Sequence, residues 1–356
     1  MPLWTLALRR TVLFYVLGLG AAGGVSAQAI AQPCTSSSCR SFLAIDGARG
    51  VTVYRSFDLD SGSPAVRRLV IVVHGSQRNP YGVFSNIVSA AQAVDKLDET
   101  LIVAPLFKTE SDLPGANDLY WTDDGWKSGD DSVGLAVSSF DVVDRIAEIV
   151  VEGAAFPNLE LVTIVGHSAG GQFTQRYAAG NPTQQAYPTL RFNYVVMNAS
   201  SYLYLNAYRP VTGTVDEFAI PSGCRDYDEY KYGIVARNRY MNRISAPVLV
   251  SRYPLRHVTY LVGVDDISRT NDLDTSCEAE AQGYTRYERG VAYSNHIEKY
   301  YSVNHHFLGS VPGVGHDSYE MSNSAAGRAT IFPDPRTIPV TSIGPVPSPP
   351  SELDAS

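Results

Sequence analysis

The sequence predicts an α/β fold with a mostly parallel sheet, and three observations support that class. Short apolar runs alternate along the chain with longer segments of helical periodicity. Several of these runs have no alternating polar positions, which is typical of strands in a sheet covered by helices on both faces. A serine between glycines follows one apolar run and precedes a helical segment, which indicates a sharp turn at the end of a buried strand. We expect this domain to span residues 30–332.

The expected strands are runs rich in β-branched and apolar residues. In chain order they are residues 51–57, 69–73, 101–105, 161–165, 192–197, 257–262 and 301–308. The first is expected at an edge of the sheet, whereas residues 69–73 are apolar throughout and predict a strand buried on both faces.

The expected helices follow the 3.6-residue period of their apolar side chains. They cover residues 84–97, 135–152, 171–179, 277–282, 288–300 and a segment from His316 to about Arg328. The helix at 135–152 is the clearest of them, because Phe140, Val143 and Ile146 fall on one stripe.

Two segments depart from this alternation. Residues 199–245 are rich in Tyr, Pro and Gly and have too little periodicity for a core of their own. Because open α/β sheets bind ligands at the C-terminal ends of their strands, we expect this insertion to cap that edge. Residues 333–356 are rich in proline and poor in apolar side chains, which predicts a disordered tail.

The first 29 residues have the pattern of a signal peptide. Arg9 and Arg10 precede an apolar run at 11–19, which is too short to span a bilayer stably, and small residues follow. The two arginines also permit the twin-arginine export route. The sequence therefore predicts a secreted or periplasmic protein without stable membrane insertion, and it leaves the cleavage position and the route open.

The composition of the 356 residues is ordinary for a globular protein, with 44% hydrophobic and 18% charged residues. The net charge of −8 and the scattered Lys and Arg argue against a nucleic-acid partner. The 22 tyrosines concentrate between Tyr177 and Tyr301. They predict either a surface or cleft for sugars, aromatics or polymers, or a solvated face.

Four cysteines remain after the expected cleavage: Cys34, Cys39, Cys224 and Cys277. An even number in an exported chain favours disulfides. Proximity favours Cys34–Cys39 and therefore Cys224–Cys277, and reduced cysteines remain the alternative. No Cys or His spacing is typical of zinc ligands, and we expect neither a metal nor a cofactor.

The turn Gly166-His167-Ser168-Ala169-Gly170 carries the strongest chemical signal. A serine hydroxyl is a weak nucleophile unless a base takes its proton and an acid orients that base. Asp266 follows the strand at 257–262 and is the expected acid, with Asp265 as the alternative. His316 lies in a glycine-rich loop after the last expected strand and is the expected base. The histidines on strands and helices (His257, His296, His305 and His306) are expected in structural positions.

Two backbone N–H groups are needed to bind the oxyanion of an acyl-transfer reaction. Ala169, directly after the serine, is expected to supply one of them, and Ser76, in the loop after the strand at 69–73, the other. Tyr120, Trp121 and Trp126 belong to a long loop at 107–133. They are expected either to stack on the substrate or to clamp this loop to the body of the domain.

Several of these motifs together resemble the α/β-hydrolase superfamily, over about residues 51–330. The matching segments are Val72-Val73-His74-Gly75, the turn at 166–170, Gly263-Val264-Asp265-Asp266 and Gly315-His316. The chain also looks like a secreted branch of serine hydrolases that contains Phe156-Pro157-Asn158-Leu159. This resemblance implies the α/β-hydrolase fold and a Ser-Asp-His triad. The loop at 74–79 lacks the His-Gly-Gly-Gly pattern of lipases, which implies a narrow oxyanion loop unsuited to esters of bulky tertiary alcohols.

The leading prediction is a secreted serine hydrolase that cleaves small-molecule or polymeric carboxylic esters through an acyl-enzyme. An exported peptidase or amidase and a non-catalytic binding protein with the same fold are the alternatives. The sequence leaves the acyl group, the alcohol and the oligomeric state open.

Overall fold

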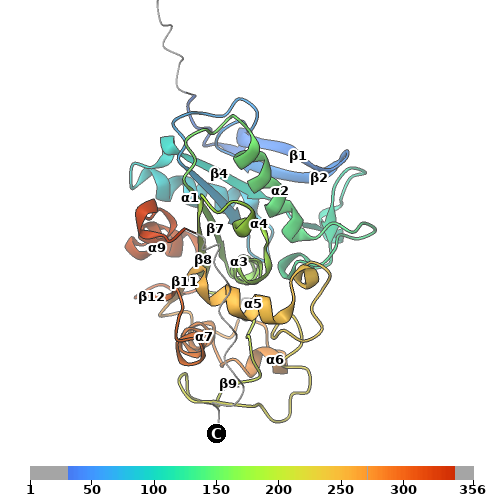
Figure 1. Ribbon diagram of the computed structural model, residues 1–356, viewed down its shortest axis with the longest axis vertical. Helices are drawn as coiled ribbons and strands as arrows, with labels where there is room; N and C mark the ends of the chain where they lie inside the picture. Colours follow the sequence, from blue (N-terminus) through green and yellow to red (C-terminus); the bar gives the residue numbers. More distant parts are fainter. Residues whose placement is uncertain (1–30, 271, 341–356) are drawn as a thin grey trace, which may run out of the picture. The chain divides into compact units, whose positions relative to one another are not determined.

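The computed structural model describes residues 31–270 and 272–340. Their central element is an eight-stranded sheet in the order β1-β2-β4-β3-β7-β8-β11-β12 (Figure 1). The six strands from β4 to β12 run parallel, whereas β1 and β2 pair antiparallel at one edge. The strands of the sheet are β1 (Arg40–Asp46), β2 (Arg49–Arg55), β3 (Arg68–Val73), β4 (Thr100–Pro105), β7 (Leu161–His167), β8 (Arg191–Met197), β11 (His257–Gly263) and β12 (His306–Val311).

Two short ribbons lie outside this sheet: β5 (Lys108–Thr109) pairs with β6 (Tyr120–Trp121), and β9 (Arg209–Pro210) pairs with β10 (Phe218–Ala219). The helices are α1 (Pro80–Gln92), α2 (Ser139–Glu152), α3 (Ala169–Gly180), α4 (Thr183–Ala186), α5 (Ala246–Arg252), α6 (Cys277–Glu280), α7 (Arg286–Tyr300), α8 (Ser318–Asn323) and α9 (Ala325–Ile331).

Helices cover both faces of the sheet, as the apolar strands predict. Leu69, Ile71 and Val73 of β3 belong to a core cluster that includes side chains of α2, α3, α5 and α7. Val70 and Val72, which point the other way, pack in a second cluster with side chains of α1, α8 and α9. The alternation of neighbouring residues between two cores follows from the two-residue period of a strand. The predicted fold class, an α/β sandwich around a mostly parallel sheet, is confirmed.

Local sequence signals define the ends of the longest helices. Ser138 and Asp141 form a capping box at the start of α2, and Thr285 and Glu288 form another at the start of α7. Asn79 caps α1, whose first residue is a proline.

Three expected elements differ from the structure, and one helix is additional. The strand at 51–57 is not at the edge, because β1 pairs outside it; the side chains of β1 are all exposed or half-buried, so its sequence lacks a core signal. The last strand begins at His306 rather than residue 301, since Tyr301 still caps α7. The helix after His316 is interrupted at Ser324, whose side chain caps α9, and α5 was not expected.

The insertion at 199–245 contains little regular structure, as expected. The buried guanidinium of Arg209 donates hydrogen bonds to the carbonyl groups of Asn206, Tyr208 and Tyr227 and thereby joins separate parts of the insertion. Apolar side chains of the insertion, such as Leu203 and Met241, pack in the core of the domain. No helix in the described part of the chain is long and apolar enough to cross a membrane.

The chain beyond residue 332 continues in contact with the domain. Ile338 is 2% exposed, and its carbonyl oxygen accepts a hydrogen bond from Arg191 Nε at 3.1 Å. The expected tail therefore does not begin at residue 333. The rest of that tail and the expected signal peptide lie outside the described residues.

Candidate active site

Ser168 occupies a strained turn between β7 and α3. Its φ of 59° and ψ of −120° lie in a region that residues with a Cβ rarely adopt. A Cβ on Gly166 would lie 2.2 Å from the carbonyl oxygen of Gly170, and one on Gly170 would lie 2.2 Å from that of Val73. Both glycines are therefore required by close backbone packing, and they hold the serine at the C-terminal end of the sheet.

His316 and Asp266 lie beside this serine. His316 Nε2 is 3.0 Å from Ser168 Oγ, and His316 Nδ1 is 2.7 Å from Asp266 Oδ2. Because a carboxylate only accepts, Nδ1 donates to Asp266, which leaves Nε2 of the neutral ring to accept the serine hydroxyl. Asp266 is 1% exposed, and its other oxygen lies 3.7 Å from Arg286 Nη1. Asp266, not Asp265, is thus the carboxylate that contacts His316.

Asn198, which was not among the residues predicted from the sequence, joins the loops that carry the acid and the base. Its side-chain oxygen accepts from the N–H of Gly263 at 2.8 Å, and its amide nitrogen donates to the carbonyl of Gly315 at 3.0 Å. The φ of Asn198 is 45°, a conformation that Asn adopts more readily than most residues. An asparagine directly after a buried strand was the available signal.

His167 lies under the ring of His316, with 4.5 Å between the ring centroids. Burial, His316 and Arg286 hold the pKa of His167 well below its usual value. His167 therefore stays neutral and adds no positive charge that would oppose protonation of His316.

The loop after β3 is fixed by two hydrogen bonds to one carbonyl. Gly75 O accepts from the backbone N–H of Arg78 at 3.0 Å and from His74 Nδ1 at 2.9 Å. Burial lowers the pKa of His74 to about 4, so this ring is neutral. The backbone N–H groups of Ser76 and Ala169 donate to no acceptor among the described residues, and both residues line a cavity at Ser168.

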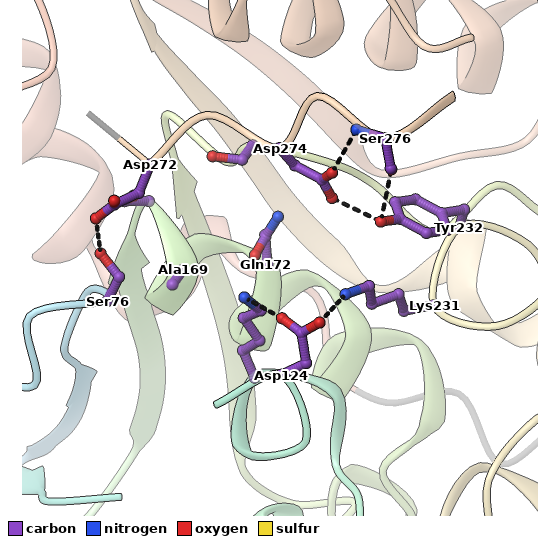
Figure 2. A pocket seen from close by; sticks show the side chains of 12 residues that line it. Ser76, Asp124, Ala169, Gln172, Lys231, Tyr232, Asp272, Asp274 and Ser276 are labelled. Carbon is purple, nitrogen blue, oxygen red and sulfur yellow. Dashed lines mark hydrogen bonds and ion pairs between the residues drawn. The ribbon is translucent and has the colours of Figure 1, made fainter. Parts of the chain in front are cut away.

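Ser168 lies at the junction of two cavities, which share Ser76, Ser168 and Asp272. We call them the lysine cavity and the histidine cavity. The lysine cavity has a volume of about 300 Å³ and is also lined by Asp124, Lys127, Ala169, Gln172, Lys231 and Asp274 (Figure 2). The histidine cavity, of about 720 Å³, includes His316, with Gln77, Asn79, Asn86, Asp317 and Tyr319. Lys231 belongs to the insertion at 199–245, so the insertion lines part of the lysine cavity, at the C-terminal edge of the sheet where it was expected.

The two tryptophans do not stack on a substrate, because both lie in the hydrophobic core. Trp121 and Trp126 are each 1% exposed. Trp126 stacks on Phe107 and contacts the ring of His74, and Trp121 Nε1 donates to the carbonyl of Val137 at 3.3 Å. Their contacts instead fit the alternative prediction, in which these side chains clamp the loop to the body of the domain. Tyr120 is half-buried and lines neither cavity at Ser168.

Many of the tyrosines are likewise buried, which contradicts the expected binding surface or solvated face. We define the tyrosine cluster as a group of aromatic side chains in successive ring contact, which come from the insertion and from the neighbouring part of the domain. Its members are Tyr202, Tyr204, Tyr253, Tyr260, Tyr293, His296 and His306. His305, just before β12, contacts the carbonyl of Leu255, and His257 contacts the side chain of Asn193. Both histidines therefore have the structural positions that the sequence predicts.

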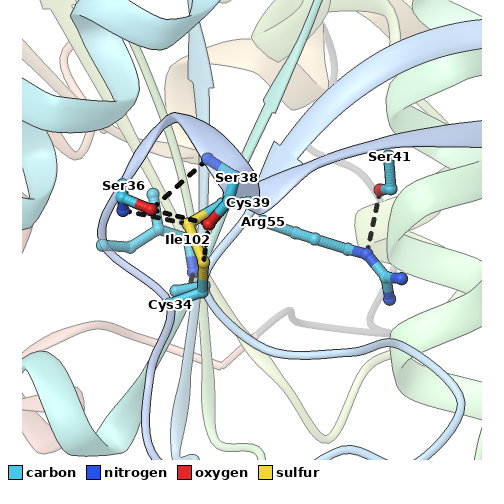
Figure 3. Close-up of a disulfide and its surroundings, with 8 residues drawn as sticks. Cys34, Ser36, Ser38, Cys39, Ser41, Arg55 and Ile102 are labelled. Carbon is cyan, nitrogen blue, oxygen red and sulfur yellow. Dashed lines mark hydrogen bonds between the residues drawn. A yellow bond between two sulfur atoms is a disulfide. The ribbon is translucent and has the colours of Figure 1, made fainter.

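Both expected disulfides are present. Cys34–Cys39 closes a short loop at the start of the described chain (Figure 3). Cys224–Cys277 links the insertion to α6, which follows Asp266 along the chain. In the described part of the chain, one group of Cys, His, Asp and Glu atoms is close enough to hold a metal: Cys224, Cys277 and Glu278. Because both cysteines are in the disulfide, only a single carboxylate remains there as a ligand.

The chain was compared with known proteins by sequence and by structure. No family model and no curated protein matches its sequence. A poly(3-hydroxybutyrate) depolymerase from Bordetella parapertussis superposes with a TM-score of 0.58 at 22% identity, over 82% of this chain and 94% of that one. A poly(aspartic acid) hydrolase-1 from Sphingomonas sp. KT-1 gives 0.59 at 19% identity, over 84% and 99%. With its parallel sheet and its serine turn after β7, the chain has the fold of the α/β-hydrolase superfamily.

Proposed function

We propose that this protein is a serine hydrolase that cleaves carboxylic esters through an acyl-enzyme. The observation that carries the proposal is the hydrogen-bonded chain from Ser168 through His316 to Asp266, which opens onto two cavities. A serine on a strained turn with a histidine ring nitrogen at 3.0 Å has the geometry required of an activated nucleophile.

In the proposed mechanism, Ser168 attacks the ester carbonyl while His316 takes the hydroxyl proton. Asp266 keeps the imidazole in the correct tautomer and stabilises the imidazolium that forms. The N–H groups of Ala169 and Ser76 bind the oxyanion of the tetrahedral intermediate. His316 then gives its proton to the departing alkoxide, and a water activated by the same ring releases the acid and restores the serine.

The two cavities suggest which part of the ester lies where. The departing alkoxide takes its proton from His316, so its oxygen must lie on the side of that ring. His316 lines the histidine cavity and not the lysine cavity. We therefore assign the alcohol part of the substrate to the histidine cavity and the acyl part to the lysine cavity.

The proposal is tested by labelling with a fluorophosphonate probe and by turnover of short 4-nitrophenyl esters. We expect the wild type to be labelled at Ser168 and to hydrolyse the ester, and Ser168→Ala to do neither. Turnover by Ser168→Ala at the wild-type rate would refute the mechanism. The matched 4-nitroanilides distinguish an esterase from an amidase, because an amidase cleaves both series.

We also propose that the protein acts outside the cytoplasm. Disulfides persist in oxidising compartments, and Cys34–Cys39 and Cys224–Cys277 fit export. Cavities on both sides of Ser168 suit an extended ester, and the depolymerase noted above acts on a polyester by its name. Cell fractionation and mass measurement of the mature N-terminus test the location, and release of soluble acid from a polyester film tests polymers as substrates.

A further inference from the structure

Two ammonium groups share one carboxylate in the lysine cavity. The chain has five lysines, and two of them, Lys127 and Lys231, line this cavity. Their Nζ atoms lie 2.6 and 3.2 Å from the two oxygens of Asp124. Figure 2 shows Lys231 directed toward Asp124. An ammonium group has three N–H donors. Within the described residues, Asp124 is the one acceptor bonded to either ammonium, so donors remain for a ligand in the cavity.

Three cationic side chains gather at this end of the cavity. Arg176 is completely buried next to the lysines and donates to the carbonyl groups of Lys127 and Lys231 at 3.1 and 3.3 Å. Three cations therefore lie around the single carboxylate of Asp124. Burial and the repulsion from Arg176 and Lys127 lower the pKa of Lys231, and a bound anion would offset that repulsion.

The other two carboxylates of the cavity already have donors of their own. Asp274 accepts from the Tyr232 hydroxyl at 2.6 Å and from the backbone N–H of Ser276 at 3.1 Å. Asp272 accepts from Ser76 Oγ at 2.8 Å. Neither forms an ion pair with a lysine of this cavity, although the charge of Lys231 contributes to lowering the pKa of Asp274. Asp124 is therefore the one carboxylate of the cavity that is ion-paired with Lys127 and Lys231.

Asp124 differs from the lysines in its exposure. Its side chain is 71% exposed, whereas those of Lys127 and Lys231 are 21% and 18% exposed. Asp124 can therefore turn into solvent while the two ammonium groups stay in place. We propose that Lys127 and Lys231 form a carboxylate subsite, and that the preferred substrate is an ester whose acyl group bears a carboxylate, such as a half-ester of a dicarboxylic acid. Asp124 takes the place of that carboxylate when the cavity is empty.

This inference rests on the proposed function and on the assignment of the acyl group to the lysine cavity. The test compares monoethyl glutarate with its neutral isostere, the ethyl ester of glutaramic acid, by ethanol release. The succinate and adipate pairs cover shorter and longer spacers. We expect the wild type to favour the carboxylate member of at least one pair by about tenfold in kcat/KM, as charge-assisted hydrogen bonds predict.

Variants separate a subsite from a structural ion pair. Lys231→Gln and Lys127→Gln should each lower the preference for the carboxylate by about tenfold, and Asp124→Asn, which removes the competing charge, should raise it. Lys96→Gln, at a surface lysine paired with Glu99, is the matched control and should keep the preference. Fluorophosphonate labelling of Ser168 reports whether each variant has folded. A second test needs no mutation: we expect glutarate, but not glutaramide, to inhibit the wild type competitively.

The outcomes distinguish the two proposals. A Ser168-dependent turnover with equal kcat/KM for both members of every pair would overturn the subsite and leave the ester hydrolase intact. The subsite would also be overturned if Lys231→Gln lowered kcat/KM equally for the carboxylate ester and the amide ester of a pair. The same holds if Asp124→Asn lowered the preference for the carboxylate ester. Absence of turnover on every ester together with absence of labelling would overturn the proposed function, and the subsite with it.

Discussion

The hydrogen-bonded site around Ser168 and the tyrosine cluster are both buried and both rich in polar atoms, but they satisfy those atoms differently. At Ser168 the ring nitrogens of His316 each have a partner, and Asn198 joins the neighbouring loops. In the tyrosine cluster, both ring nitrogens of His296 and the hydroxyl of Tyr204 have no hydrogen-bond partner among the described residues. The first region is organised by directed hydrogen bonds and leaves one buried oxygen, Asp266 Oδ1, without a hydrogen bond. The second combines hydrogen bonds at Tyr253, Tyr260 and His306 with ring packing, and it leaves more buried polar atoms unsatisfied.

Asp266→Asn should have the largest effect, because it removes a directed hydrogen bond on which the proposed reaction depends. The amide donates where the carboxylate accepts, so it favours the wrong tautomer of His316. We expect kcat to fall by about 10⁴-fold with little change in fold. Esterase kinetics measure the effect, and circular dichroism provides the control. A fall of less than tenfold would show that Asp266 does not act through His316.

Acid should weaken the tyrosine cluster through its histidines. His306 is half-buried against Tyr253 and Tyr260, and its removal from solvent lowers its pKa to about 3, below the 6.5 of an exposed histidine. The unfolded chain therefore binds the proton more readily than the folded chain. Stability contributed by this group is complete above pH 6.5 and is lost as the pH falls toward 3, by about 2 kcal/mol between pH 6.5 and 5.

Urea unfolding at pH 7, 6 and 5 measures this loss. His306→Phe should reduce the pH dependence in that range. If the variant kept the full slope, the lost stability would belong to other buried histidines, such as His74 with a pKa of about 4.

Asn198→Ala tests whether the joint between the loops positions the base. Losing the bonds to Gly263 and Gly315 should lower kcat by about tenfold to a hundredfold with a smaller effect on KM. The pH profile of kcat should shift, because His316 loses its fixed relation to Asp266. Asn198→Asp retains the acceptor for Gly263 and should recover part of the rate. An unshifted profile with a lowered melting temperature would indicate a structural role only.

The sequence predicted more of the site at Ser168 than of the tyrosine cluster, for a physical reason. Gly166, Ser168 and Gly170 lie close in the chain, and their backbone packing leaves a local pattern. Asp266 and His316 each follow a strand, so strand prediction was sufficient to find them.

The sequence could not show which side chains become buried together from distant segments. Trp121 and Trp126 were interpreted as residues of a polar loop because part of their surroundings comes from distant segments: His74, which follows β3, contacts Trp126, and the carbonyl of Val137 accepts a hydrogen bond from Trp121. Lys127 and Lys231 are 104 positions apart, from the difference of their numbers, and only the folded chain brings both to Asp124. The strand β1 had no buried side chain to mark it.

His296→Phe should give the smallest effect and the opposite sign to most core substitutions. The ring of His296 contacts Tyr204, Phe218 and Tyr300, and burial holds its pKa well below the usual value. Replacing it with an apolar ring of similar shape removes two unsatisfied nitrogens, so we expect a gain of about 1 kcal/mol in the free energy of unfolding at pH 7.

His306→Phe is the matched control. It loses bonds to the Tyr260 hydroxyl at 2.7 Å and to the Tyr253 carbonyl at 3.0 Å and should destabilise the fold. Equal losses in both variants would mean that ring packing tolerates no change at either position, and that the difference in hydrogen bonding between the two histidines does not govern their contributions to stability.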